Sequence, residues 1–81
     1  MIPGLNTNVE YENLTWHVQT EDQGSQRNRF ITQVFRAGEV IATSETTYAH
    51  GLDLGTKLRQ QRRAHRAMID ALRAGRLTDL D

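Results

Sequence analysis

The spacing of apolar residues changes near residue 50. Before this point apolar and polar residues alternate, which is the period of a half-buried β-strand. Turn-forming residues divide this half of the chain into four predicted strands: Thr7–Tyr11, Leu14–Glu21, Arg29–Arg36 and Val40–Tyr48. After it, apolar residues recur every three or four positions, which predicts one long amphipathic helix across Leu52–Gly75.

The connections predict how these elements are arranged. Glu12-Asn13 and Ala37-Gly38 are typical of tight hairpins, while 22–28 is a polar loop. Asp53 is placed to cap the helix and Gly75 to end it, with Leu77 folding back on its last turn. Because short turns make neighbouring strands antiparallel, we expect an α+β fold: a four-stranded antiparallel β-meander followed by one long C-terminal α-helix packed on one face. We expect one ββββα domain over 1–81, loose at 1–7 and 77–81.

The predicted helix has an unusual apolar side. On a helical wheel this side holds Leu54, Leu58, Met68, Ile69 and Leu72. Gln61 and His65 lie in its middle, where amphipathicity alone predicts leucine. One interpretation is that they hydrogen-bond into the sheet, because a buried polar group without a partner costs about 1–3 kcal/mol. The other is that they line a pocket or a pH-sensitive subunit contact.

The two flanks of this helix differ in chemistry. One, the Arg flank, carries Arg59, Arg62, Arg63, Arg66 and Arg73; the other, the Ala flank, carries Ala64, Ala67, Ala71 and Ala74. The Arg flank is a candidate partner-binding surface, for protein or for nucleic acid phosphates, unless it is a solvated helix face. The Ala flank permits close approach of another backbone, although alanine is also simply the best helix former.

The width of the predicted sheet, compared with that of one helix, predicts a second subunit. Four strands span roughly 15–20 Å, whereas one helix is about 10 Å wide. The apolar residues of Arg29–Arg36 occupy both alternation sets, so both faces of this strand should be partly buried. All the aromatic residues precede the helix: Tyr11, Trp16, Phe30, Phe35 and Tyr48. We therefore expect a homodimer, with Trp16, Gln61 and His65 in its core or interface.

Composition narrows the possible functions. The chain has 81 residues and no cysteine, which excludes disulfides and thiolate metal sites and fits a reducing cytoplasm. It has neither an apolar run of membrane-spanning length nor a secretory signal pattern at its start. Its formal net charge is zero, but residues 1–50 carry three cations against six carboxylates, and 51–81 carry seven against four.

Recognisable catalytic motifs are absent. His17, His50 and His65 have no metal-ligand spacing, and no nucleophile elbow or phosphate-binding glycine loop appears. Glu21-Asp22 is a carboxylate pair at a strand end, but adjacent strand residues point to opposite faces. We predict no catalytic residue, metal or cofactor. A small-ligand or enzyme site around His65, Gln61, Trp16 and His17 is the weakest of three alternatives.

Several segments together resemble a small uncharacterised bacterial domain that occurs alone or appended to signalling and tetratricopeptide-type proteins. They are His17–Asp22 (HVQTED), Ile31–Phe35 with Gly38–Ile41, Thr46–Tyr48, and a helix with His65 and Leu72. The resemblance covers roughly residues 8–76. It implies an accessory or adaptor role and supplies no catalytic residues.

These observations predict a small non-enzymatic homodimeric adaptor in the cytoplasm, which binds another protein through its sheet edge, open face or Arg flank. The alternative is a nucleic-acid-binding accessory protein that uses the Arg flank. Overall neutrality and the lack of a helix-turn-helix motif count against this alternative.

Overall fold

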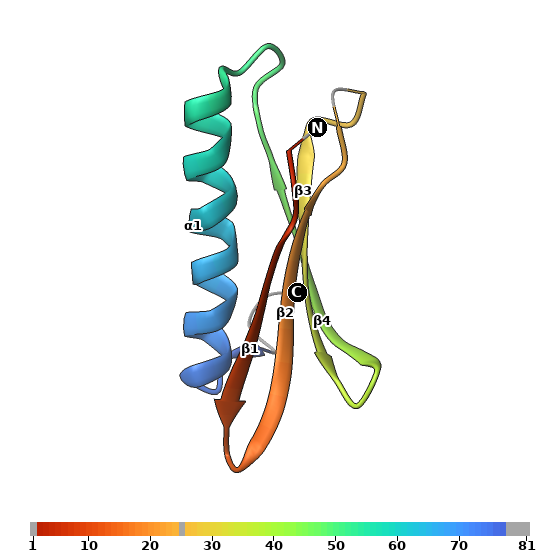
Figure 1. Ribbon diagram of the computed structural model, residues 1–81, viewed down its shortest axis with the longest axis vertical. Coiled ribbons are helices and arrows are strands. Elements are labelled where there is room, and N and C mark those ends of the chain that lie inside the picture. Colours follow the sequence, from red (N-terminus) through yellow and green to blue (C-terminus); the bar gives the residue numbers. More distant parts are fainter. Residues whose placement is uncertain (1, 25, 78–81) are drawn as a thin grey trace.

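A computed structural model describes residues 2–24 and 26–77 of the chain. Four strands form one antiparallel sheet in the order β1-β2-β3-β4, and one helix follows. Their bounds are β1 (Leu5–Tyr11), β2 (Leu14–Asp22), β3 (Arg29–Arg36), β4 (Glu39–Thr47) and α1 (Leu54–Arg73). The helix runs beside one face of the sheet, roughly along the strands (Figure 1). The predicted α+β fold is confirmed.

The two tight hairpins form where the sequence predicts them. Glu12 and Asn13 have φ of 52° and 63°, and Ala37 and Gly38 have φ of 51° and 82°. Two successive residues with positive φ are typical of a type I′ turn, whose twist matches that of the flanking strands. The strand bounds differ from the prediction by one or two residues, and one difference matters: Asp22 ends β2 instead of starting the loop.

The helix is capped as predicted, although it is two residues shorter at each end. Asp53 Oδ2 accepts a hydrogen bond from Thr56 N at 3.0 Å. At the other end Gly75 has φ of 70°. Its N–H donates to the carbonyl of Leu72, and that of Arg76 donates to Ala71. This pair of bonds is a Schellman motif, and Leu77 packs back on the core as expected.

The core lies between α1 and one face of the sheet. Its larger cluster joins one valine from each of β1, β2 and β3 to the second half of the helix: Val9, Val18, Val34, Met68, Ile69 and Leu72. A smaller cluster lies near the start of the helix and comprises Ile2, Phe30 and Tyr48, with Leu52 and Leu58 packed against it. Leu54, predicted on the apolar side, is 61% exposed, because it is the first helical residue and Leu52 packs against the core in its place.

The N-terminal segment is more ordered than predicted. Ile2 is buried, and Leu5, Asn6 and Thr7 already belong to β1. The carbonyl of Pro3 accepts a hydrogen bond from Gln61. The predicted loose segment 1–7 is therefore wrong for residues 2–7, because buried side chains and hydrogen bonds hold them. Of the predicted loose tail, residues 78–81 lie outside the described part of the chain.

The expectation that one helix cannot cover the aromatic side chains of the sheet needs a correction. Phe30 and Tyr48 are buried beneath the helix, and Tyr11 and Trp16 pack against the core at half burial. Phe35 alone lies on the opposite face, next to His17. That face is largely polar, so one helix covers most of the aromatic surface. This happens because the strand alternation directs four of the five aromatic residues to the helix side.

The uncovered region lies beside the helix instead. α1 packs on β2, β3 and β1, and has at most minor contact with β4. β4 also forms one outer edge of the sheet. Its pairing with β3 shifts between Val34 and Phe35, which leaves Ile41 as the extra residue of a β-bulge. Val40 and Ile41 are 51% and 40% exposed at this point.

Candidate functional site

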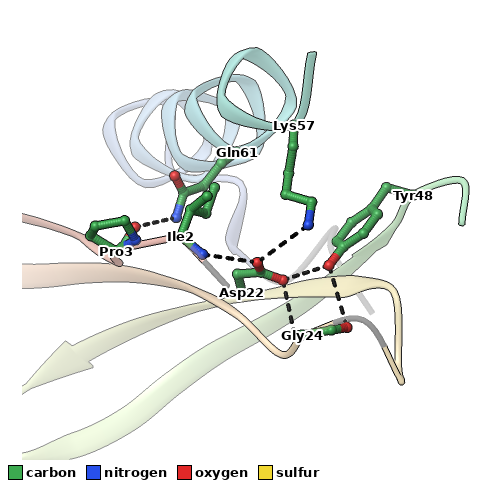
Figure 2. Close-up of polar contacts among 7 residues, drawn as sticks. All are labelled: Ile2, Pro3, Asp22, Gly24, Tyr48, Lys57 and Gln61. Carbon is green, nitrogen blue, oxygen red and sulfur yellow. Dashed lines mark hydrogen bonds and ion pairs between the residues drawn. The ribbon is translucent and has the colours of Figure 1, made fainter. Parts of the chain in front are cut away.

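Asp22 is the centre of a buried polar cluster near the start of the helix (Figure 2). Its carboxylate accepts hydrogen bonds from Ile2 N at 3.2 Å, Gly24 N at 3.0 Å and Tyr48 Oη at 2.6 Å. Lys57 Nζ lies 3.8 Å from Asp22 Oδ2 and 4.8 Å from the centre of the Tyr48 ring. The cluster therefore joins the N-terminal segment, the β2–β3 loop, the end of β4 and the helix.

The electrostatics of the Asp22 cluster indicate a structural role. Burial alone would raise the pKa of Asp22, but hydrogen bonds from Tyr48, Gly24 and Ile2 and the charge of Lys57 lower it below its usual value. Burial and the Asp22 carboxylate raise the pKa of Tyr48 to about 12. At neutral pH the carboxylate is thus ionised and the phenol is protonated. Neither group is suited to general acid–base chemistry near pH 7.

The sequence contained a signal for this cluster that the prediction missed. The inward-facing residues of β2 are Trp16, Val18, Thr20 and Asp22, each two positions apart. Continuing this alternation by one step places Asp22 on the buried face. The sequence pattern places Asp22 in the loop because it begins the polar, glycine-containing stretch 22–28. Most of its partners come from remote parts of the chain. Glu21 lies on the opposite, exposed face, as adjacent strand residues should.

His65 and Gln61 are buried under the middle of the helix. The His65 ring lies between two threonine hydroxyls, with Nε2 2.9 Å from Thr7 Oγ1 and Nδ1 2.8 Å from Thr20 Oγ1. Gln61 Nε2 donates to the Pro3 carbonyl at 2.9 Å. His65 thus bonds into the sheet as the first interpretation expects, whereas Gln61 bonds to the segment before β1.

Protonation of His65 is unfavourable in this environment. Burial lowers the pKa of His65, and the nearby His17 lowers it further. The ring is therefore neutral at pH 7, with one nitrogen as donor and the other as acceptor. A threonine hydroxyl can serve either role, so both nitrogens are satisfied. Thr20 extends the chain of hydrogen bonds to Thr32 Oγ1 at 3.0 Å.

The proposed grouping of His65, Gln61, Trp16 and His17 into a ligand site is wrong. His17 lies on the open face, where its ring contacts the side-chain oxygens of Asn6 and Asn8. Trp16 lies at the Tyr11 end of the core and donates from Nε1 to the Tyr11 carbonyl at 3.1 Å. Strand alternation separates these two neighbours in sequence. Across residues 2–24 and 26–77, no three His, Cys, Asp or Glu side chains are arranged to hold a metal ion.

The Arg flank is exposed along its whole length, but its members face different features. Arg62 and Arg66 line a cleft of about 340 Å³ between α1 and β1. Arg63 instead borders a cleft of about 350 Å³ on the β4 side. Arg59 donates to Thr56 Oγ1 near the helix start. Arg63 thus belongs structurally with the Ala flank, because one further residue rotates it by about 100° around the helix.

The cleft on the β4 side lies between the Ala flank and the uncovered strand. It is lined by Thr46, Thr47, Gln60, Arg63, Ala64 and Ala67. A smaller cavity of about 70 Å³ adjoins it and shares Thr46, Ala64 and Ala67. The amide oxygen of Gln60 is buried and has no hydrogen-bond partner among the described residues. Small side chains on both walls leave the helix and β4 only partly packed here.

Comparisons with protein-family models, curated proteins and solved structures find no match to this chain. Within the described residues no helix is both long and apolar enough to cross a membrane.

Proposed function

We propose that this domain is a small non-enzymatic homodimeric adaptor of the cytoplasm, whose second copy packs against the Ala flank and β4. The observation that carries the proposal is that α1 packs on β1, β2 and β3 and leaves the helix-side face of β4 only half-buried. Four strands span roughly 15–20 Å and one helix about 10 Å. The remaining width is comparable with a second helix.

The uncovered region has the properties of a self-contact. Ala64 and Ala67 keep the helix surface low, which permits close approach of another helix. The unpartnered Gln60 oxygen costs free energy in the isolated chain, and a donor from a second copy would relieve this cost. An isologous contact uses the same patch twice, so the patch need complement only itself.

A non-enzymatic role is supported by the state of the buried polar groups. The polar atoms of Asp22 and His65 are engaged by partners within the chain. The side chains around the β4 cleft are threonine, alanine, glutamine and one arginine. This set has no nucleophile paired with a base, which fits binding better than catalysis.

The test is the molar mass of the domain in solution, measured by sedimentation equilibrium. The wild type should have twice the mass of the 9.3 kDa chain. Ala67→Glu places a charge in the contact and should give a monomer. Leu54→Glu adds the same charge to an exposed position away from the groove, so it should remain dimeric. A wild type that is monomeric at millimolar concentration would refute the dimer.

Nucleic acid binding by the Arg flank is the second candidate function. The helix carries six cationic side chains and one carboxylate, Asp70. Phosphate contacts by such a surface would make affinity fall steeply with salt. Anisotropy of a labelled dT12 oligonucleotide at rising salt tests this candidate, which fails if no binding occurs even at low salt.

A further inference from the structure

The outer edge of β1 is regular, and no other strand pairs with it among residues 2–24 and 26–77. All seven residues, Leu5–Tyr11, pair with β2 in an unbroken register. Within these bounds there is no proline, no lysine and no bulge, which are devices that protect sheet edges from pairing. The other edge differs, because the bulge in β4 interrupts it. β1 is therefore the edge that can accept a further strand.

Arginine side chains line the space above this edge. The cleft of about 340 Å³ is bounded below by Leu5 and Thr7 of β1 and above by Arg62 and Arg66 of the helix. His65 and Ile69 form its inner wall. A strand that added to β1 would place alternate side chains in this cleft, beneath the two guanidinium groups.

The spacing of the arginines matches that of an extended chain. Residues four apart on a helix have Cβ atoms about 5–6 Å apart, and residues two apart on a strand are about 6.7 Å apart. α1 and the strands run in a similar direction (Figure 1). Arg59, Arg62, Arg66 and Arg73 extend over about 21 Å of helix, close to the roughly 23 Å of a seven-residue strand.

The charge of this surface is uncompensated in the described residues. Neither Arg62 nor Arg66 has a carboxylate within salt-bridge distance there; the ion pairs that form are Arg29–Glu45 and Lys57–Asp22. Like charges four residues apart on a helix repel each other and weaken the helix. A carboxylate-bearing ligand would remove this repulsion and could form bidentate bonds with each guanidinium.

We propose that β1 and the Arg62–Arg66 pair form a docking site for an extended acidic peptide segment of a partner protein. The segment adds to β1 as a fifth strand and directs carboxylates from alternate residues to the two arginines. Backbone hydrogen bonds to the strand edge provide affinity, and the alternation of acidic residues provides specificity. This inference rests on the proposed adaptor function and names the chemistry of its partner.

A peptide fits this surface better than nucleic acid does. The free edge of β1 offers backbone donors and acceptors at strand spacing, which another strand satisfies and a phosphate backbone does not. The aromatic side chains on which unpaired bases usually stack are absent from the lining of this cleft. The chain as a whole is also neutral, whereas nucleic-acid-binding domains are typically basic.

The experiment measures binding of a fluorescein-labelled peptide, Thr-Glu-Thr-Glu-Thr-Glu-Thr, to the full chain by anisotropy. A second peptide has the same sequence but carries N-methyl groups on alternate backbone amides, which removes hydrogen-bond donors and keeps the charge. We expect the first peptide to bind and the second to bind at least about tenfold more weakly. Arg62→Ala and Arg66→Ala should each weaken binding about fivefold.

Arg63→Ala is the matched control, because it removes the same charge from the same helix on the β4 side. Its affinity should equal that of the wild type. The proposal is overturned if both peptides bind equally, if Arg63→Ala weakens binding as much as Arg62→Ala, or if dT12 binds and the peptide does not. Sedimentation of the same samples separates the two proposals. If the chain is a monomer and binds the peptide, only the dimer is refuted. If the chain is a dimer and does not bind the peptide, only the docking site is refuted.

Discussion

Asp22 and His65 are both buried beneath α1, but the Asp22 carboxylate is charged and the His65 ring is neutral. Two of the donors to Asp22 are backbone N–H groups, those of Ile2 and Gly24. The partners of His65 are the hydroxyls of Thr7 and Thr20. Backbone donors cannot rotate away when their acceptor is lost, whereas hydroxyls can turn to another partner.

This difference separates two ways of tolerating a polar group in a core. The Asp22 cluster ties together four segments that are distant in sequence, so its loss leaves several groups unsatisfied at once. The His65 centre is a chain of hydroxyls within the sheet face, so its loss is local. We therefore expect substitutions at Asp22 to destabilise the fold much more than changes to His65.

The largest effect should come from Asp22→Ala. The substitution leaves the Lys57 ammonium and the Tyr48 hydroxyl without their partner, and removing one member of a buried ion pair typically costs about 3–5 kcal/mol. Urea unfolding measures this loss of unfolding free energy. Glu21→Ala is the control. Glu21 is the exposed neighbour of Asp22, and its substitution should change the unfolding free energy by less than about 0.5 kcal/mol. A loss below about 1 kcal/mol for Asp22→Ala would contradict the assigned role.

Tyr48 should give the next largest effect. Tyr48→Phe removes a hydrogen bond to a charged acceptor, which contributes about 1.5–3 kcal/mol, and keeps the ring that packs on Phe30. The pKa of Tyr48 is about 12 in the folded chain and about 10 in the unfolded one. The stabilisation from Tyr48 is therefore complete below pH 10 and is lost as pH rises toward 12.

Absorbance of the phenolate at 295 nm measures this titration directly. The background variant Tyr11→Phe removes the other tyrosine, whose pKa is also raised, first by its hydrogen bond with Glu12. In this variant the midpoint should lie near 12. A midpoint at 10 in a chain that is still folded would show that Tyr48 does not bond to Asp22.

His65 should produce the smallest effect, visible as a dependence of stability on pH. Its pKa is lower in the folded than in the unfolded state, so the unfolded chain binds the proton first. Stability should fall as pH decreases below about 6.5, by at most about 1.4 kcal/mol per unit for one proton. Asp22 does not contribute to this pH dependence, because the pKa of an unfolded aspartate is about 3.9.

The comparison variant for the pH range below about 6.5 is His65→Gln. In this variant the slope of stability against pH should largely disappear. His50→Gln retains His65 and should keep the slope, because His50 is exposed after β4. Urea midpoints at pH 7.5, 6.5 and 5.5 provide the measurement. Equal slopes in His65→Gln and the wild type would assign the effect to another group.

The candidate sites were predictable only in part. The Arg flank, the Ala flank and the buried positions of Gln61 and His65 follow from helical periodicity, which is a local property of the chain. The Asp22 cluster did not follow, since the partners of Asp22 are Ile2, Gly24, Tyr48 and Lys57, up to 35 residues away. Separation in sequence carries no information about which of these groups meet.

Local rules determined the elements and their order. Alternation, turn residues and caps predicted four strands and one helix within a few residues, because each depends on interactions between near neighbours. The tertiary structure decided where the helix lies across the sheet. As a result the helix-side face of β4 is only half-buried, and Arg62 and Arg66 lie beside β1. Periodicity defines which side of a helix is apolar but not the strands on which it packs, because that choice depends on side-chain volumes from all five elements at once.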